Sequence, residues 1–123
     1  MADQLAKIGG LPDVPVAETL PAPAPWAYRN SARLHGAGND LGYYAADTRD
    51  LQPLDSDPLL LPVLNEALAA LRSVLHNDAP AEVVLRLSET HGYALAALRP
   101  AAETNPLLLV QRWRAQCPAL AGV

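Results

Sequence analysis

Arginine and histidine occur at alternate positions over residues 28–35. In an extended strand successive side chains point to opposite faces, so Arg29, Arg33 and His35 are expected to share one face with Ser31. The opposite face would carry the intervening side chains, Tyr28, Asn30, Ala32 and Leu34. A guanidinium binds phosphate and carboxylate groups through a planar fork of N–H donors. The pattern therefore predicts a strand with one basic face that suits an anionic ligand.

The groups that usually perform catalysis are few and dispersed. Three histidines lack the spacing of metal ligands: His35, His76 and His91. Four aspartates lie near one another but fit no calcium-binding loop, and we expect them to serve turns and caps: Asp47, Asp50, Asp55 and Asp57. Cys117, near a helix end and beside proline, is interpreted as an inert, half-buried thiol rather than a nucleophile. No glycine-rich loop has phosphate- or dinucleotide-binding spacing, so these residues alone do not predict a self-sufficient enzyme.

The composition is that of a folded domain. Half of the 123 residues are hydrophobic and 18% are charged. The formal net charge of −4 argues against a surface covered in nucleic-acid-binding charge but allows a local basic face. The single cysteine excludes an internal disulfide and a cysteine-based zinc site. The sequence lacks an apolar run of about 18 residues and the apolar core of a signal peptide, so we expect a cytoplasmic protein with no membrane partner.

Residues 1–25 are expected to precede the folded domain, which spans residues 26–123. Residues 2–8 predict a short helix that stops at Gly9-Gly10. Residues 11–25 contain five prolines, and proline removes a backbone donor and restricts the residue before it. We interpret this segment as a stiff linker, with a proline-rich ligand motif as the alternative.

Two similar halves are predicted within the domain. The first half comprises a strand over 28–35, a loop over 36–40, a return strand over 41–46 that residues 51–54 extend, and a helix over 58–76. Asp57 would cap this helix and Pro58 would occupy its first position. The second half comprises a strand over 83–87, a turn over 89–92, a strand over 93–98, a helix that Asn105-Pro106 opens and Cys117-Pro118 closes, and residues 119–123, which lead onward.

The halves share short motifs, which indicate an internal repeat or a chance similarity. Arg33-Leu34 corresponds to Arg86-Leu87, and both helices begin with a capping residue, a proline and three leucines. We expect an α+β fold with the order β-β-α-β-β-α and a four-stranded, largely antiparallel sheet with both helices on one face. Arg86 would then join Arg29 and Arg33 on the uncovered face.

Three segments resemble the central region of RNA uracil-5-methyltransferases. They are Trp26–His35 (WAYRNSARLH), Leu41–Asp47 (LGYYAAD) and Leu54–Asn65 (LDSDPLLLPVLN), and the later hairpin and Cys117–Val123 (CPALAGV) fit the same region. These enzymes use S-adenosylmethionine to make 5-methyluridine in 23S ribosomal RNA and transfer RNA. The resemblance covers essentially the whole chain and rests on the order and spacing of the motifs.

The resemblance also implies what this chain should lack. The family begins with a nucleic-acid-binding β-barrel and ends with a Rossmann-like methyltransferase domain, and we expect both to be absent here. Cys117 does not match the motif of the family's nucleophilic cysteine, so no catalytic residue and no S-adenosylmethionine site is expected in this chain. A family iron–sulfur ligand position appears here as Asp57, so neither an iron–sulfur cluster nor another metal is expected.

The resemblance implies a domain that presents RNA, ribosomal or transfer, to a methyltransferase domain. The candidate RNA-binding residues are Arg29, Arg33, His35, Tyr44 and Arg86. Residues expected to maintain the local structure are Tyr28, Asn30, Asp57 and Pro58. The alternatives are a structural spacer that packs on the methyltransferase domain and a standalone protein-interaction module. Because of the net charge, the isolated domain is expected to bind RNA weakly.

Overall fold

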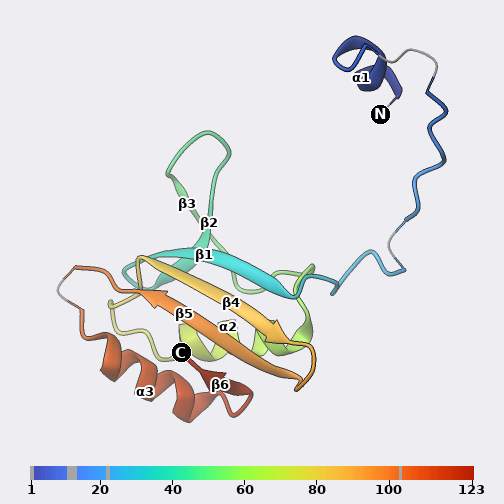
Figure 1. Ribbon diagram of the computed structural model, residues 1–123. Helices are drawn as coiled ribbons and strands as arrows, with labels where there is room; N and C mark the ends of the chain where they lie inside the picture. Colours follow the sequence, from blue (N-terminus) through green and yellow to red (C-terminus); the bar gives the residue numbers. More distant parts are fainter. Residues whose placement is uncertain (1, 11–13, 22, 103) are drawn as a thin grey trace.

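Over the residues that the structure describes, the fold consists of a six-stranded sheet and three helices (Figure 1). The computed structural model describes residues 2–10, 14–21, 23–102 and 104–123. In chain order the elements are α1 (Ala2–Lys7), β1 (Ser31–Ala37), β2 (Asp40–Tyr44), β3 (Leu51–Pro53), α2 (Pro62–Ser73), β4 (Glu82–Ser88), β5 (Tyr93–Arg99), α3 (Pro106–Gln116) and β6 (Leu120–Gly122). The strand order is β3-β2-β1-β4-β5-β6, and every neighbouring pair is antiparallel except the parallel pair β5–β6. The α+β class is therefore confirmed.

The sheet has six strands rather than the predicted four, and β3 is one of the additions. Residues 51–54 were expected to extend the preceding strand, but the chain reverses before them. Asp47 has a positive φ of 61°, and the Ala45 N–H donates to the Asp50 carbonyl at 2.9 Å. This turn brings Leu51–Pro53 back alongside β2 as a separate antiparallel strand.

The other additional strand, β6, comes from the segment that was predicted only to lead onward. The Leu120 N–H donates to the Cys117 carbonyl at 3.0 Å, which turns the chain back after α3. The Ala94 N–H then donates to the Ala119 carbonyl at 2.8 Å, and β6 runs parallel to β5. Because β5 and β6 are separated in sequence by α3, no local pattern predicts that they pair.

The first hairpin is tighter than its predicted five-residue loop. Its turn is the two residues Gly38-Asn39, and Gly38 has a φ of 62° that favours glycine. The flanking strands shift accordingly. β1 covers 31–37 instead of 28–35, and β2 covers 40–44 instead of 41–46.

The first long helix begins at Pro62, not at Pro58, so the predicted cap at Asp57 is wrong. The chain forms a turn over residues 57–60, where the Leu60 N–H donates to the Asp57 carbonyl at 3.0 Å. Two prolines four residues apart compete for the start of the helix, and the turn uses the first of them. The second helix does start as predicted, because the Asn105 side chain accepts from the N–H groups of Leu107 and Leu108.

Both helices cover one face of the sheet, as predicted (Figure 1). The Trp113 indole N–H on α3 donates to the Ala67 carbonyl on α2 at 2.8 Å, which joins the two helices inside the core. Cys117 is buried rather than half-buried. The largest fully buried side chains are Trp113, Leu34, Leu41, Leu60, Leu64, Leu68, Leu71, Leu85, Val83 and Pro80.

The N-terminal segment lies apart from the sheet (Figure 1). The predicted short helix is present as α1, and residues 14–21 of the linker have no regular structure. Residues 11–13 and 22 of the predicted linker lie outside the described residues. Within the described ranges, no helix has the length and apolar character needed to cross a membrane.

Candidate functional site

The helices leave the other face of the sheet uncovered, and we call this the open face. On β1, Ala32 and Leu34 are buried against the helices while Arg33 is exposed on the open face. On β4, Val83 and Leu85 are buried, and Arg86 is exposed on the open face. The prediction that Arg33 and Arg86 share a face is therefore confirmed.

The strand register places these two arginines close together. Arg86 lies opposite Ser31, and Arg33 lies opposite Val84, so Arg33 and Arg86 are diagonal neighbours across β1 and β4. Such neighbours are about 7–8 Å apart in an antiparallel pair. Two long guanidinium side chains at that separation can contact neighbouring phosphates of one extended nucleic-acid strand or one larger anion.

A second basic group lies further along the open face, where His35 and Tyr44 stack with ring centroids 4.0 Å apart. They border a hollow of about 430 Å³ whose lining includes Arg49 and Arg99. The His35 Nδ1 atom is buried and has no hydrogen-bond partner among the residues that the structure describes. Arg99 also faces Glu82, with 3.8 Å between guanidinium nitrogen and carboxylate oxygen. The hollow therefore combines two arginines with an aromatic stack, and Glu82 pairs with one of these arginines.

Sequence reasoning missed Arg49 and Arg99. Arg99 ends the alternating strand β5, so strand periodicity could have placed it on the open face together with Leu95 and Ala97. Arg49 belongs to the turn between β2 and β3. No local sequence pattern predicts that this turn reaches the hollow.

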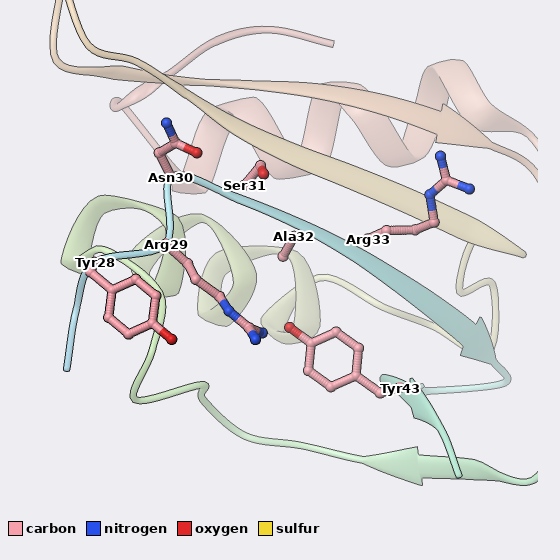
Figure 2. Close-up of a pocket in the computed structure, with 7 residues that line it drawn as sticks. All are labelled: Tyr28, Arg29, Asn30, Ser31, Ala32, Arg33 and Tyr43. Carbon is pink, nitrogen blue, oxygen red and sulfur yellow. The ribbon is translucent and has the colours of Figure 1, made fainter. Parts of the chain in front are cut away.

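Arg29 does not lie on the open face, which corrects the prediction that it shares a face with Arg33. Ala27 has a φ of 52°, and the chain here pairs with the segment before α2 instead of continuing β1 backwards. The Arg29 N–H donates to the Leu59 carbonyl at 2.8 Å, and the Arg29 carbonyl accepts from the Leu61 N–H at 3.0 Å. Figure 2 shows the Arg29 side chain reaching toward Tyr43, whereas Arg33 points the other way.

Tyr43 and Asp57 form the polar anchor of this region. The Tyr43 hydroxyl donates to Asp57 Oδ2 at 2.8 Å, and the Leu59 N–H donates to Asp57 Oδ1 at 2.8 Å. Asp57 is only 7% exposed. Burial, followed by the hydrogen bond and the negative charge of Asp57, raises the pKa of Tyr43 to about 12, although the Arg29 guanidinium opposes this rise.

The backbone of Asp57 is held by Asn65, the fourth residue of α2. The Asp57 N–H donates to Asn65 Oδ1 at 3.0 Å, and Asn65 Nδ2 donates to the Asp57 carbonyl at 2.8 Å. Asp57 and Pro58 therefore lie in a turn that precedes α2, not at the helix cap and first helical position predicted for them. Sequence reasoning did not single out Tyr43 or Asn65 as residues that hold this turn.

A cavity of about 440 Å³ opens between β1 and β2, and we call it the β1–β2 cavity (Figure 2). It exists because β1 pairs with β2 over His35–Ala37, whereas alongside the earlier residues of β1 the β2–β3 hairpin projects away from the sheet (Figure 1). The lining residues are Tyr28, Arg29, Asn30, Ser31, Ala32, Arg33 and Tyr43. The cavity therefore has guanidinium, hydroxyl and backbone groups on its walls.

The segment that leads into this cavity exposes two aromatic rings. Trp26 is 61% exposed and Tyr28 is 52% exposed. Asn30 holds the segment against the β4–β5 turn, because its side-chain amide donates to a Glu89 carboxylate oxygen at 2.6 Å. The Asn30 side chain is therefore engaged within the domain, while Tyr28 leaves its ring accessible.

Two ion pairs lie away from the open face and the β1–β2 cavity. Arg112 on α3 forms an ion pair with Asp78 and lies 2.6 Å from His76 Nδ1. Burial would raise the pKa of Asp78, but the His76 N–H and the Arg112 guanidinium outweigh it, so this pKa lies below its usual value. Asp55 likewise pairs with Arg72. Across the described ranges, no group of three or more His, Cys, Asp or Glu side chains could hold a metal ion.

Comparison with known proteins identifies relatives for much of the chain. An uncharacterised RNA methyltransferase of Gloeobacter violaceus is 27% identical over an alignment of 129 positions that covers 82% of this chain and 28% of that protein. Uncharacterised RNA methyltransferases of two Bacillus cereus strains are each 32% identical over 94 positions, covering 73% of this chain and 18% of theirs. No protein-family model matches the chain. The chain is thus related in sequence to RNA methyltransferases and spans less than a third of their length.

Proposed function

We propose that this chain is the RNA-recognition domain of an RNA uracil-5-methyltransferase and that its open face contacts the substrate RNA. The observation that carries the proposal is the pair Arg33 and Arg86, side by side on an uncovered sheet face of a chain whose net charge is −4. An acidic protein that gathers arginines on one surface has a local site for an anion. Its sequence relatives are named as enzymes that act on RNA.

The open face has the chemistry that unpaired RNA requires. Guanidinium groups bind phosphates and stack on bases, and the exposed Tyr44 ring with its His35 partner offers a further stacking surface. The arginine pair supplies phosphate contacts rather than base-specific ones, so the domain binds the RNA backbone and leaves selection of the target uridine to other parts of the enzyme. The acidic remainder of the chain makes this binding weak and dependent on salt.

Catalysis, in this proposal, belongs to the part of the parent enzyme that the alignments leave uncovered. That part amounts to more than two-thirds of each relative. It would bind S-adenosylmethionine and supply the nucleophile and the base that methylate C5 of uracil. The 123 residues alone should neither bind S-adenosylmethionine nor methylate RNA, which calorimetric titration and a methyl-transfer assay can check.

Titration of the isotope-labelled chain with a single-stranded RNA oligonucleotide, followed by amide chemical shifts, tests the proposal. We expect the largest shifts at Arg33, Tyr44 and Arg86, and small shifts along α2 and α3. Shifts confined to the helices would refute the proposed face. An absence of binding at low salt would favour the alternative, in which the open face packs on the methyltransferase domain.

A further inference from the structure

We propose that the β1–β2 cavity binds one unpaired nucleotide, with the base against Tyr28 and the phosphate against the Arg29 guanidinium. This inference rests on the proposed function, because it names the part of the RNA that a separate site on the same domain would take. The cavity lies beside the open face, and its lining includes Ser31 and Arg33 of that face. Its volume of about 440 Å³ falls within the range of about 300–1,000 Å³ that is usual for small-ligand sites.

The backbone of β1 supplies hydrogen-bonding groups to this cavity. The Leu87 N–H on β4 donates to the carbonyl of Asn30, the residue before β1, at 2.8 Å, so these two residues form a hydrogen-bonded pair. Hydrogen-bonded and non-bonded pairs alternate along an antiparallel ladder. The N–H and C=O groups of Ser31 and Arg33 therefore point away from β4, toward the cavity. Donors and acceptors of this kind can pair with the edge of a base.

Aromatic groups provide the walls. The rings of Tyr28 and Tyr43 lie on either side of the Arg29 guanidinium (Figure 2). Tyr43 is fixed by its hydrogen bond to Asp57, so this wall is rigid before any ligand arrives. Tyr28 is more than half exposed, and a base that stacks on it would cover apolar ring surface that now contacts water.

The charges of the site favour a phosphate. Arg29 lines the cavity and is exposed, and its guanidinium reaches toward Tyr43, so it remains accessible to an incoming anion (Figure 2). Arg33 also lines the cavity, but its guanidinium points to the open face. The carboxylate of Asp57 is the closest described acidic group to Tyr43 and is already engaged by two donors. A nucleotide satisfies the aromatic, hydrogen-bonding and cationic walls together, whereas inorganic phosphate satisfies only the last of these.

The test uses uridine monophosphate, inorganic phosphate and a fluorescein-labelled oligouridine as probes. Uridine monophosphate should shift the amide signals of Ser31 and Arg33 at concentrations where inorganic phosphate leaves them unchanged. Tyr28→Leu should weaken oligouridine binding about tenfold, equivalent to ~1.4 kcal/mol, which lies within the range for base stacking on an aromatic ring. Tyr28→Phe keeps the ring and should bind like the unmodified chain. Arg114→Gln, on the exposed surface of α3, is the matched charge control.

The outcomes separate this inference from the proposed function. If Arg86→Gln weakens oligouridine binding and Tyr28→Leu does not, the open face binds RNA and the nucleotide site is refuted. Equal shifts with inorganic phosphate and uridine monophosphate would reduce the site to a simple anion site and overturn the inference. If the unmodified chain binds no oligouridine but uridine monophosphate shifts Ser31 and Arg33, the nucleotide site stands and the proposed RNA role of the open face fails.

Discussion

Replacing Tyr43 with phenylalanine should destabilise the domain by about 1.5–2 kcal/mol at neutral pH. The change removes one hydroxyl, which donates to the Asp57 carboxylate at 2.8 Å. Hydrogen bonds to charged groups contribute about 1.5–3 kcal/mol, and leaving a buried acceptor unpaired adds to the loss. Tyr43 is partly exposed and Asp57 keeps its bond from the Leu59 N–H, so we expect the lower part of that range.

The same pair predicts a change in stability at alkaline pH. The pKa of Tyr43 is about 12 in the folded chain and 10.0 in its ordinary state, so the folded protein holds the phenol proton more tightly than the unfolded protein does. The stabilisation is complete below pH 10 and is lost as the pH rises toward 12. Phenylalanine has no such proton. The difference in unfolding free energy between the two proteins should therefore shrink above pH 10.

Urea denaturation of both proteins at pH 7 and at several values between pH 9 and pH 11 measures both effects. Tyr28→Phe is a matched control, because its ring is exposed and should change stability by less than about 0.5 kcal/mol. Equal stability of Tyr43→Phe and the unmodified chain at pH 7 would show that the Tyr43–Asp57 bond does not hold the turn. A difference that grows with pH would show that the pKa of Tyr43 is lowered on folding.

Three further changes probe the packing of Trp113 in the core, the Asn105 cap of α3, and the ion pair between Arg112 on α3 and Asp78. Trp113→Phe removes the hydrogen bond to the Ala67 carbonyl and leaves a void, so thermal and urea unfolding should show a loss of about 1–3 kcal/mol; a loss below 0.5 kcal/mol would contradict the packing described. Asn105→Ala removes the side-chain cap of α3 and should cost about 1 kcal/mol, whereas Asn105→Asp should retain most of the stability. The pKa of Asp78 is lowered on folding, so its carboxylate stabilises the folded state at neutral pH. The stability advantage of the unmodified chain over Asp78→Asn should therefore be complete above about pH 5 and should fall as the pH drops below 3.8. A difference that does not depend on pH would refute this.

Periodicity predicted the parts of the fold in which burial alternates along a strand. Ala32 and Leu34 face the core and Arg33 faces away, so strand alternation alone placed Arg33 correctly. Arg86 followed from the similarity between the two halves of the chain. The capping residue Asn105 was predictable because its partners are only two and three residues away.

The errors at Arg29 and Asp57 concern contacts between segments that are distant in sequence. Arg29 leaves the open face because the positive φ of Ala27 and the pairing with Leu59 override the alternation. Asp57 looks like a helix cap because Pro58 follows it, but its carboxylate is bound by Tyr43, 14 residues earlier. Tertiary hydrogen bonds of this kind decide between two local structures that the sequence permits equally.

The salt dependence of RNA affinity tests the central claim most directly. Fluorescence anisotropy with a single-stranded oligouridine would compare the unmodified chain, Arg33→Gln/Arg86→Gln and Arg114→Gln over a series of salt concentrations. Each phosphate contact to a single strand contributes about 0.7 to the slope of log affinity against log salt. The double variant should therefore bind more weakly and lose about 1.4 from that slope, while Arg114→Gln keeps the slope of the unmodified chain. Equal slopes for all three proteins would contradict RNA recognition by the open face.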